Sequence, residues 1–194
     1  MDIFLKFAGE KAQLMTITKV QPADAEALRY LAERTFRDAW QDENEPEAFE
    51  QYCRENFSLE NVKAELTTPG TEFYFAKING EPIAYLKLNI DKQPKPPSDP
   101  EPPGEYSSPA LQLERIYVLQ GIQSQGLGAD LLRFAEQRAR ETGATWIWLS
   151  VWQKSPRTIA FYKRHGFDVF GMETFWVGDD PQPDWLMRKQ FRNG

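Results

Sequence analysis

The chain has 194 residues, 41% of them hydrophobic, which suits one domain with its own core. Its net charge of −6, without a prominent Lys/Arg run, argues against nucleic acid as a partner. Its apolar runs are far shorter than the roughly 20 residues of a membrane helix, which argues against a membrane. With Cys53 as the one cysteine, no internal disulfide can form. We predict a single cytoplasmic domain over residues 1–194, with a compact core at 15–191.

The first 70 residues show the patterns of a strand and three helices. Met15–Val20 alternates apolar and polar residues as a strand does. Beyond Pro22 apolar residues recur at helical spacing, and Pro46–Phe57 has a second apolar face of this kind. Ser58 is a suitable N-cap for a third helix over Leu59–Leu66, because its hydroxyl can accept a hydrogen bond from the first turn.

A hairpin and a proline-rich loop follow. Glu72–Ile78 and Pro82–Asn89 alternate like strands, and Asn79-Gly80 between them favours a type I′ turn, in which both central residues have positive φ. The Pro-rich loop, 92–109, cannot be a helix or a central strand, because Pro94–Pro109 contains seven prolines. We interpret it as a surface insertion.

The second half alternates strands with helices. The predicted strands are Leu111–Val118, Trp146–Trp152, Phe167–Gly178 and Asp184–Phe191, and the predicted helices are Gly126–Glu141 and Ser155–His165. A strand–helix–strand unit at the centre should be parallel and right-handed. We therefore predict an α/β fold: a mixed, mostly antiparallel twisted sheet of about six to seven strands, with that parallel unit and with helices on both faces.

The segment Leu113–Ala129 carries the most informative motif. It reads as a strand, a short loop, the motif Gln123-x-x-Gly126-x-Gly128, and a helix that begins there. Glycines allow close backbone approach, and the free N–H groups at a helix start attract anions, so the motif favours pyrophosphate binding. A Walker loop is excluded because no Gly-Lys-Ser/Thr ends the motif, and the spacing does not fit a dinucleotide fold. A glycine-rich loop that only turns the chain stays an alternative.

The sequence resembles the GNAT superfamily of acetyl-CoA-dependent N-acetyltransferases over residues 15–191. The similar segments are RIYVLQGIQSQGLGADLL, for the pantetheine strand and pyrophosphate loop, and WIWLSVWQKSPRTIAFYKRHGF, for the next strand and helix. The tail GMETFWVGDDPQPDWLMRK is similar to the branch of PaiA-type polyamine acetyltransferases. The resemblance implies acetyl-CoA as the acetyl donor and a wedge between the strands of Leu111 and Trp146 that holds the thioester.

The resemblance also implies roles for individual residues. The backbone of Ile116 and Val118 would bind pantetheine, and Tyr162 would protonate the departing thiolate. Ser155 stands where the family often has Asn, so its contact with pantetheine should be weaker, although serine is a good N-cap. The residues that would surround the pyrophosphate are Gln123, Ser124, Gly126, Leu127, Gly128 and Ala129.

Aminolysis of a thioester requires a neutral amine, so a general base is expected. Glu114 is the best candidate, because alternation places it opposite Leu113 and Arg115, near the cleft strand. Glu173 and Asp184 are weaker candidates that we expect at the surface.

The other reactive residue types offer little. His165, the only histidine, is expected to cap a helix C-terminus. With one Cys and one His, no metal-ligand spacing exists, so no metal site is predicted.

We predict transfer of an acetyl group from acetyl-CoA to a primary amine of a small molecule, with a polyamine as one candidate because Asp179, Asp180 and Asp184 could attract a polycation. The alternatives are a protein N-terminal or lysine acetyltransferase and an acyl-CoA-sensing module with little turnover. By resemblance a homodimer is common for such folds, and aromatic residues of the tail could form its interface. These residues are Phe175, Trp176 and Trp185.

Overall fold

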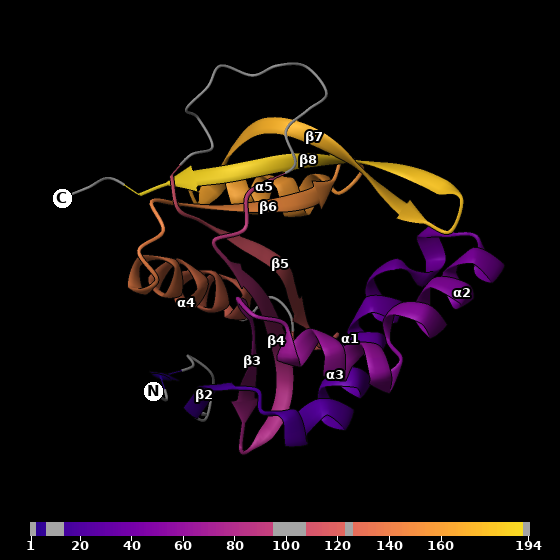
Figure 1. The fold of residues 1–194 in the computed structure, drawn as a ribbon, viewed down its shortest axis with the longest axis horizontal. Helices are drawn as coiled ribbons and strands as arrows, with labels where there is room; N and C mark the ends of the chain where they lie inside the picture. Colours follow the sequence, from indigo (N-terminus) through magenta and orange to yellow (C-terminus); the bar gives the residue numbers. More distant parts are fainter. Residues whose placement is uncertain (1–2, 7–13, 95–107, 123–125, 192–194) are drawn as a thin grey trace. The chain divides into compact units, whose positions relative to one another are not determined.

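The computed structural model of the chain describes residues 3–6, 14–94, 108–122 and 126–191 (Figure 1). Backbone contacts group the chain into two compact units, each made of two separate segments. The first unit comprises Met1–Leu88 and Arg115–Ala135, and the second comprises Asn89–Glu114 and Glu136–Gly194. Two strands and one helix contribute residues to both units, so the units are not successive domains along the chain.

The sheet of the first unit has the strand order β1-β2-β3-β4-β5. Its strands are β1 (Ile3–Lys6), β2 (Leu14–Lys19), β3 (Thr71–Ile78), β4 (Glu81–Ile90) and β5 (Ala110–Val118). β1 and β3 both pair antiparallel with β2. The sequence analysis did not predict β1. The hairpin turn is confirmed, since Asn79 and Gly80 both have positive φ, 53° and 85°.

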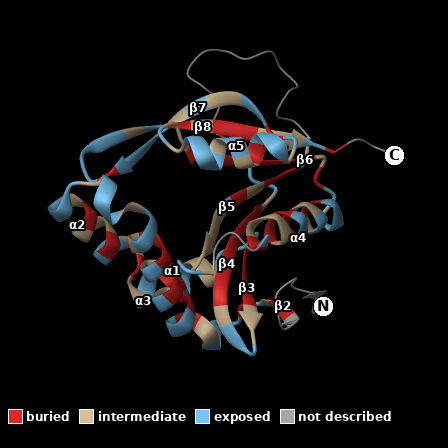
Figure 2. Ribbon diagram, turned by 180° about the vertical axis from the view of Figure 1, so that it is seen from behind, coloured by how far each residue is buried: buried red, intermediate tan, exposed pale blue. Residues whose placement is uncertain are grey.

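Helices cover both faces of this sheet, as predicted. The helices are α1 (Ala25–Trp40), α2 (Pro46–Asn56), α3 (Leu59–Thr67) and α4 (Leu127–Glu141), with short 3₁₀ turns at Pro22–Asp24 and Gln41–Glu43. Phe73 and Phe75 of β3 share one buried cluster with α1, α2 and α3, and Figure 2 shows these helices striped with buried and exposed residues. Tyr74 points to the other face, where its ring lies 4.7 Å from that of Phe134 on α4.

The second unit continues from β5 in the order β5-β6-β8-β7. Its further elements are β6 (Trp146–Trp152), α5 (Pro156–Arg164), β7 (Asp168–Val177) and β8 (Asp180–Gln190). β6 runs parallel to β5, whereas β8 runs antiparallel to both β6 and β7. The predicted α/β class with a parallel strand–helix–strand unit is therefore confirmed, and β1 raises the number of described strands to eight.

The parallel pairing of β5 with β6 is short. It joins Ala110–Gln112 to Trp146–Trp148 and, within the described residues, does not continue to Leu113 and Glu114. On its other side, β6 pairs with β8 along its whole length, Trp146–Trp152. The two parallel strands of the second unit therefore separate after their first three residue pairs.

Two tryptophans of β6 bind the ends of the Pro-rich loop. The indole N–H of Trp148 donates to the Lys92 carbonyl at 2.7 Å, and that of Trp146 donates to the Ser108 carbonyl at 3.3 Å. The side-chain amide of Gln93 also donates to Ser108, at 2.9 Å. Residues 95–107 of the predicted loop lie outside the described residues.

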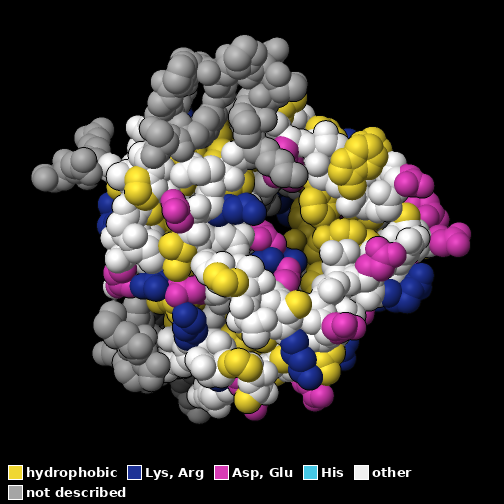
Figure 3. All heavy atoms as spheres, in the orientation of Figure 1, with side chains coloured by type: hydrophobic (Ala, Val, Ile, Leu, Met, Phe, Trp, Pro, Cys, Tyr) yellow, Lys and Arg dark blue, Asp and Glu magenta, His cyan; other side chains and the backbone are white. Residues whose placement is uncertain are grey.

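On the face drawn in Figure 3, acidic and basic side chains of the described residues are intermixed. None of the helices in the described parts is long and apolar enough to cross a membrane. In β7, Phe175 and Trp176 are 38% and 56% exposed, so two of the three aromatic residues suggested for an interface lie at the surface, and the homodimer stays a prediction.

The two helix starts marked by serine allow a matched test of capping. Ser58 accepts a hydrogen bond from the Asn61 N–H at 3.2 Å, whereas Ser155, at the N-cap of α5, makes no such bond. We expect Ser58→Ala to lower the free energy of unfolding by about 1 kcal/mol and Ser155→Ala to change it by less than about 0.5 kcal/mol. Urea unfolding of both variants measures the difference, and equal losses would contradict it.

Candidate active site

The start of α4 has the geometry of an anion-binding site. Gly126 has a φ of 84°, and its carbonyl accepts the first helical hydrogen bonds, from the N–H groups of Ala129 at 3.0 Å and Asp130 at 3.1 Å. The N–H groups of Leu127 and Gly128 make no hydrogen bond to any residue that the structure describes. These two donors and the positive end of the helix dipole can therefore receive a phosphate.

The surroundings of this helix start fit such a ligand. A Cβ added to Gly126 would meet nothing within 4 Å, so the backbone is open on this side. Leu127 is buried and anchors the first turn. The carboxylate of Asp130, also in the first turn, is paired with Arg133, which offsets its charge near the start of the helix. The predicted ligands Gln123 and Ser124 lie outside the described residues.

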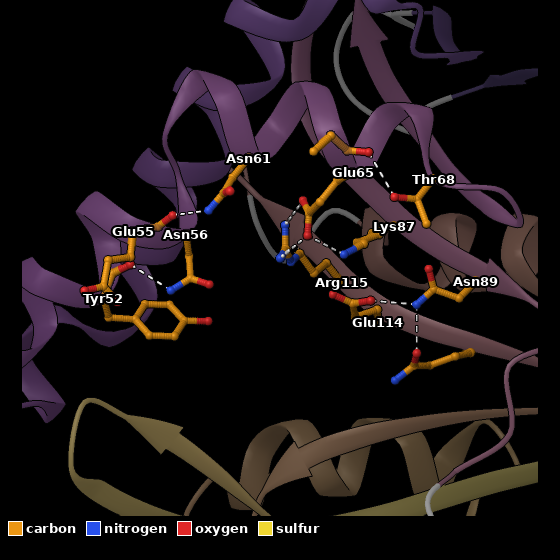
Figure 4. A network of polar contacts seen from close by, with 12 residues as sticks. Tyr52, Glu55, Asn56, Asn61, Glu65, Thr68, Lys87, Asn89, Glu114 and Arg115 are labelled. Carbon is orange, nitrogen blue, oxygen red and sulfur yellow. Dashed lines mark hydrogen bonds and ion pairs between the residues drawn. The ribbon is translucent and has the colours of Figure 1, made fainter.

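Ion pairs and hydrogen bonds hold the last part of β5 in the first unit (Figure 4). The guanidinium of Arg115 donates to both oxygens of Glu65 on α3, at 3.1 and 3.0 Å, and Lys87 donates to the same carboxylate at 2.5 Å. The Tyr117 hydroxyl accepts from the indole of Trp40 at 2.9 Å. Because side chains alternate along a strand, those of Ile116 and Val118 point to the opposite face.

Glu114 belongs to a polar cluster in the second unit. The side-chain amide of Asn89 donates to Gln112 at 2.8 Å and to Glu114 at 2.6 Å. Glu114 itself is exposed, whereas Asn89 is buried.

The expected alternation between Glu114 and Arg115 is wrong. Lys87 and Asn89 lie two residues apart in β4, so their side chains share one face. Arg115 binds the carboxylate that Lys87 binds, and Glu114 binds Asn89. Both residues of β5 therefore reach the same face of β4, and the alternation of β5 is interrupted between them.

Asp184 on β8 is buried, contrary to the expectation of a surface residue. It is 8% exposed, and its Oδ2 accepts a hydrogen bond from the Ser150 hydroxyl of β6 at 2.8 Å. Burial raises the pKa of Asp184 to about 6, the Ser150 hydrogen bond works against this rise, and the charge of Glu173 on β7 adds to it. A carboxyl with such a pKa can exchange protons near neutral pH. Only the strand pairing could have shown this burial.

The Glu114 cluster and the Ser150–Asp184 pair lie on one face of the second unit's sheet. Residues paired across neighbouring strands point to the same side. Gln112 pairs with Trp148, and Asp184 pairs with Trp152, two strand positions beyond Ser150. The two polar sets thus share the face that carries the tryptophans of β6.

The predicted residues of α5 are both in the second unit. Tyr162 is buried, with its ring 5.3 Å from that of Phe161 and 5.5 Å from that of Phe167. Ser155 stands at the N-cap, and its hydroxyl makes no capping hydrogen bond. The expectation that this hydroxyl caps the helix is therefore wrong.

The remaining reactive side chains have structural roles. The Nδ1 of His165 lies 2.8 Å from the Phe161 carbonyl, to which it must donate, at the C-terminus of α5. Burial raises the pKa of the Cys53 thiol to about 11, which makes it a poor nucleophile. In the described part of the chain, no group of His, Cys, Asp and Glu could hold a metal ion.

Comparison with known proteins identifies the family. The model of the acetyltransferase (GNAT) family matches residues 25–167, and the chain belongs to this family. An uncharacterized N-acetyltransferase from the pepI 3′ region of Lactobacillus delbrueckii subsp. lactis is 33% identical over 173 residues, 89% of this chain and 95% of the relative. The uncharacterized N-acetyltransferase Rv2669 of Mycobacterium tuberculosis is 27% identical over 169 residues, 86% of this chain and 97% of the relative.

Solved structures share the fold. The PaiA N-acetyltransferase from Thermoplasma acidophilum, solved in complex with coenzyme A, matches with a TM-score of 0.70 and 21% identity, over 91% of this chain and 99% of that one. At this identity, the likeness shows that the two chains share a fold.

Asp184 should make the stability of the protein depend on pH. Its pKa rises on folding from the ordinary value of 3.8 to about 6, so the folded protein binds this proton more tightly than the unfolded chain. The resulting stabilisation is fully present below about pH 4 and is lost as the pH rises through about 6. At 1.36 kcal/mol per pKa unit it amounts to about 3 kcal/mol.

We therefore expect the unfolding free energy of the wild type to fall by about 3 kcal/mol relative to that of Asp184→Asn between about pH 4 and pH 7. Urea unfolding at several pH values measures this difference, in which the other carboxyl groups cancel. Parallel curves for the two proteins would contradict the burial of this carboxyl.

Proposed function

We propose that this protein transfers an acetyl group from acetyl-CoA to a primary amine of a small molecule, with a polyamine as the first candidate. The observation that supports the donor most directly is the start of α4, where the N–H groups of Leu127 and Gly128 are without a described partner beside Gly126. Family membership supports the reaction type, and the related fold of PaiA was solved with coenzyme A.

The residues proposed for the donor fit its chemistry. The start of α4, with Gly126, Leu127, Gly128 and Ala129, would receive the pyrophosphate, together with Gln123 and Ser124 of the preceding loop. The backbone of Ile116 and Val118 would bind the pantetheine amides as an added strand would. The hydroxyl of Ser155, which makes no capping hydrogen bond to α5, would offer pantetheine a further hydrogen bond.

Two proton transfers are required of the protein. An alkyl ammonium has a pKa near 10.4, so about one molecule in 10³ is neutral at pH 7 and a base must remove a proton before attack. We propose that Tyr162 protonates the departing thiolate. For the base, Glu114 and Asp184 are both candidates, and they lie on one face of the second unit.

Three aspartates near β8 and a cytoplasmic location fit this proposal. Asp179, Asp180 and Asp184 lie on and before β8, where their charges would favour a cationic acceptor. Acetyl-CoA is available in the cytoplasm, which is the compartment that we propose. Two alternatives are a protein N-terminus or lysine as the acceptor and a module that binds acyl-CoA without turnover. The experiments below distinguish both from an acetyltransferase of small amines.

The donor site can be tested with two glycines of α4 that share a conformation. Gly126 and Gly143 flank opposite ends of the helix, have φ values of 84° and 79°, and leave open space for a Cβ. We expect Gly126→Glu to weaken acetyl-CoA binding at least about tenfold, or 1.4 kcal/mol, because it places a negative charge at the pyrophosphate, whereas Gly143→Glu should leave the affinity unchanged.

Calorimetry with acetyl-CoA measures both variants beside the wild type. Equal affinities of the two variants would contradict the assignment of the α4 start, and a wild type that does not bind acetyl-CoA would overturn the proposed function.

The role of Tyr162 separates an enzyme from a binding module. We expect Tyr162→Phe to lower kcat by about 10²-fold, because it removes the acidic hydroxyl and keeps the ring that packs between Phe161 and Phe167. Acetyl-CoA affinity should not change. Turnover is measured as free thiol released with spermidine, and with N-terminal and lysine peptides for comparison. Unchanged kcat would refute this role.

A further inference from the structure

The buried carboxylate of Asp184 has few partners. Ser150 donates to its Oδ2, while its Oδ1 accepts no hydrogen bond from a described residue. Within the described residues no Lys or Arg forms an ion pair with it. A buried carboxylate without a cationic partner is costly, because it loses hydration and gains no opposite charge. The site therefore favours an incoming cation or proton.

Charged groups near Asp184 do not supply that cation. Glu173 stands opposite Asp184 in β7 and is itself acidic. On the β6 side, the ammonium of Lys154 lies 5.5 Å from the centre of the Trp152 ring. Arg188, further along β8, lies over the Phe170 ring at 5.1 Å. These two cations are held against aromatic rings, and neither pairs with Asp184.

The position of Ser150 connects this carboxylate to the reaction proposed above. Ser150 lies two residues beyond Trp148, the last residue of β6 that pairs with β5, and it is still paired with Leu186 of β8. In the family that the sequence resembles, the thioester would lie where these two strands separate. A base beside Ser150 would then lie two residues beyond the last pair of these two strands.

Glu114 is less suited to remove the proton. It is exposed, and its Oε2 already accepts a hydrogen bond from the Asn89 amide at 2.6 Å. Asp184, in contrast, is buried, and this burial raises its pKa to about 6, which suits a group that accepts a proton near neutral pH.

We propose that Asp184, positioned by Ser150, is the group that removes the proton from the acceptor ammonium. This inference rests on the proposed function. The Asp184 carboxylate takes one proton from the ammonium, and the freed electron pair of nitrogen forms the bond to the thioester carbon. When the carbon–sulfur bond breaks, sulfur takes the Tyr162 proton. The second proton of nitrogen restores Tyr162, and Asp184 returns its own proton to water.

The test is the pH dependence of kcat at saturating acetyl-CoA, with spermidine as acceptor. The wild type should lose activity with a slope of one below about pH 6. Asp184→Asn should lower kcat by about 10²-fold at neutral pH and abolish this acidic limb, while acetyl-CoA binding, measured by calorimetry, stays as in the wild type. Glu114→Gln is the comparison: it should keep the acidic limb, whatever its effect on KM.

Ser150→Ala tests the positioning role and replaces Asp184→Asn if that variant does not fold. Because the Ser150 hydrogen bond lowers the pKa of Asp184, its loss should move the acidic limb to higher pH. The inference is overturned if the acidic limb of the kcat profile does not move in Ser150→Ala. It is also overturned if this limb disappears in Glu114→Gln and persists in Asp184→Asn. In both cases the proposed function still stands. A wild type that binds acetyl-CoA but does not acetylate spermidine overturns both the polyamine proposal and this inference.

Discussion

The early end of the pairing between β5 and β6 is the constraint on which the site depends. Parallel strands are held by evenly spaced backbone hydrogen bonds, and here these stop after Gln112 and Trp148. Each strand must then be held by other partners: β6 by β8, and β5 by β4 and the pairing of Arg115 with Glu65 on α3. The strands can part without loss of order because each has a second neighbour.

The residues named in the proposed function are divided between the two compact units. The residues proposed for the donor on β5 and at the start of α4 belong to the first unit, and Ser150, Tyr162 and Asp184 belong to the second. β5 belongs to both, since the division falls between Glu114 and Arg115. The interrupted alternation at this point lets consecutive side chains serve one face: the first joins a polar cluster, and the second fixes the strand to a helix.

Local patterns predicted nearly every helix and strand, because period, caps and turn residues act over a few positions. The hairpin at Asn79-Gly80 and the cap at Ser58 are of this kind. Burial of Asp184 could not be predicted in this way. Two prolines and two acidic residues precede it in the segment 178–183, which resembles a turn. It is buried because β6 and β7 flank it, and this depends on distant parts of the chain. The role proposed for Tyr162 comes from the resemblance alone, since its own sequence pattern indicates only a packed aromatic residue.

The indole hydrogen bonds of Trp146 and Trp148 bear on how well the protein tolerates changes in loop length. They fix both ends of the Pro-rich loop on β6, and Gln93 joins the two ends to each other. Once the ends of a loop are fixed, its length affects stability only logarithmically, by about 0.6 kcal/mol for each doubling. Insertions and deletions between these anchors should therefore cost the sheet little stability.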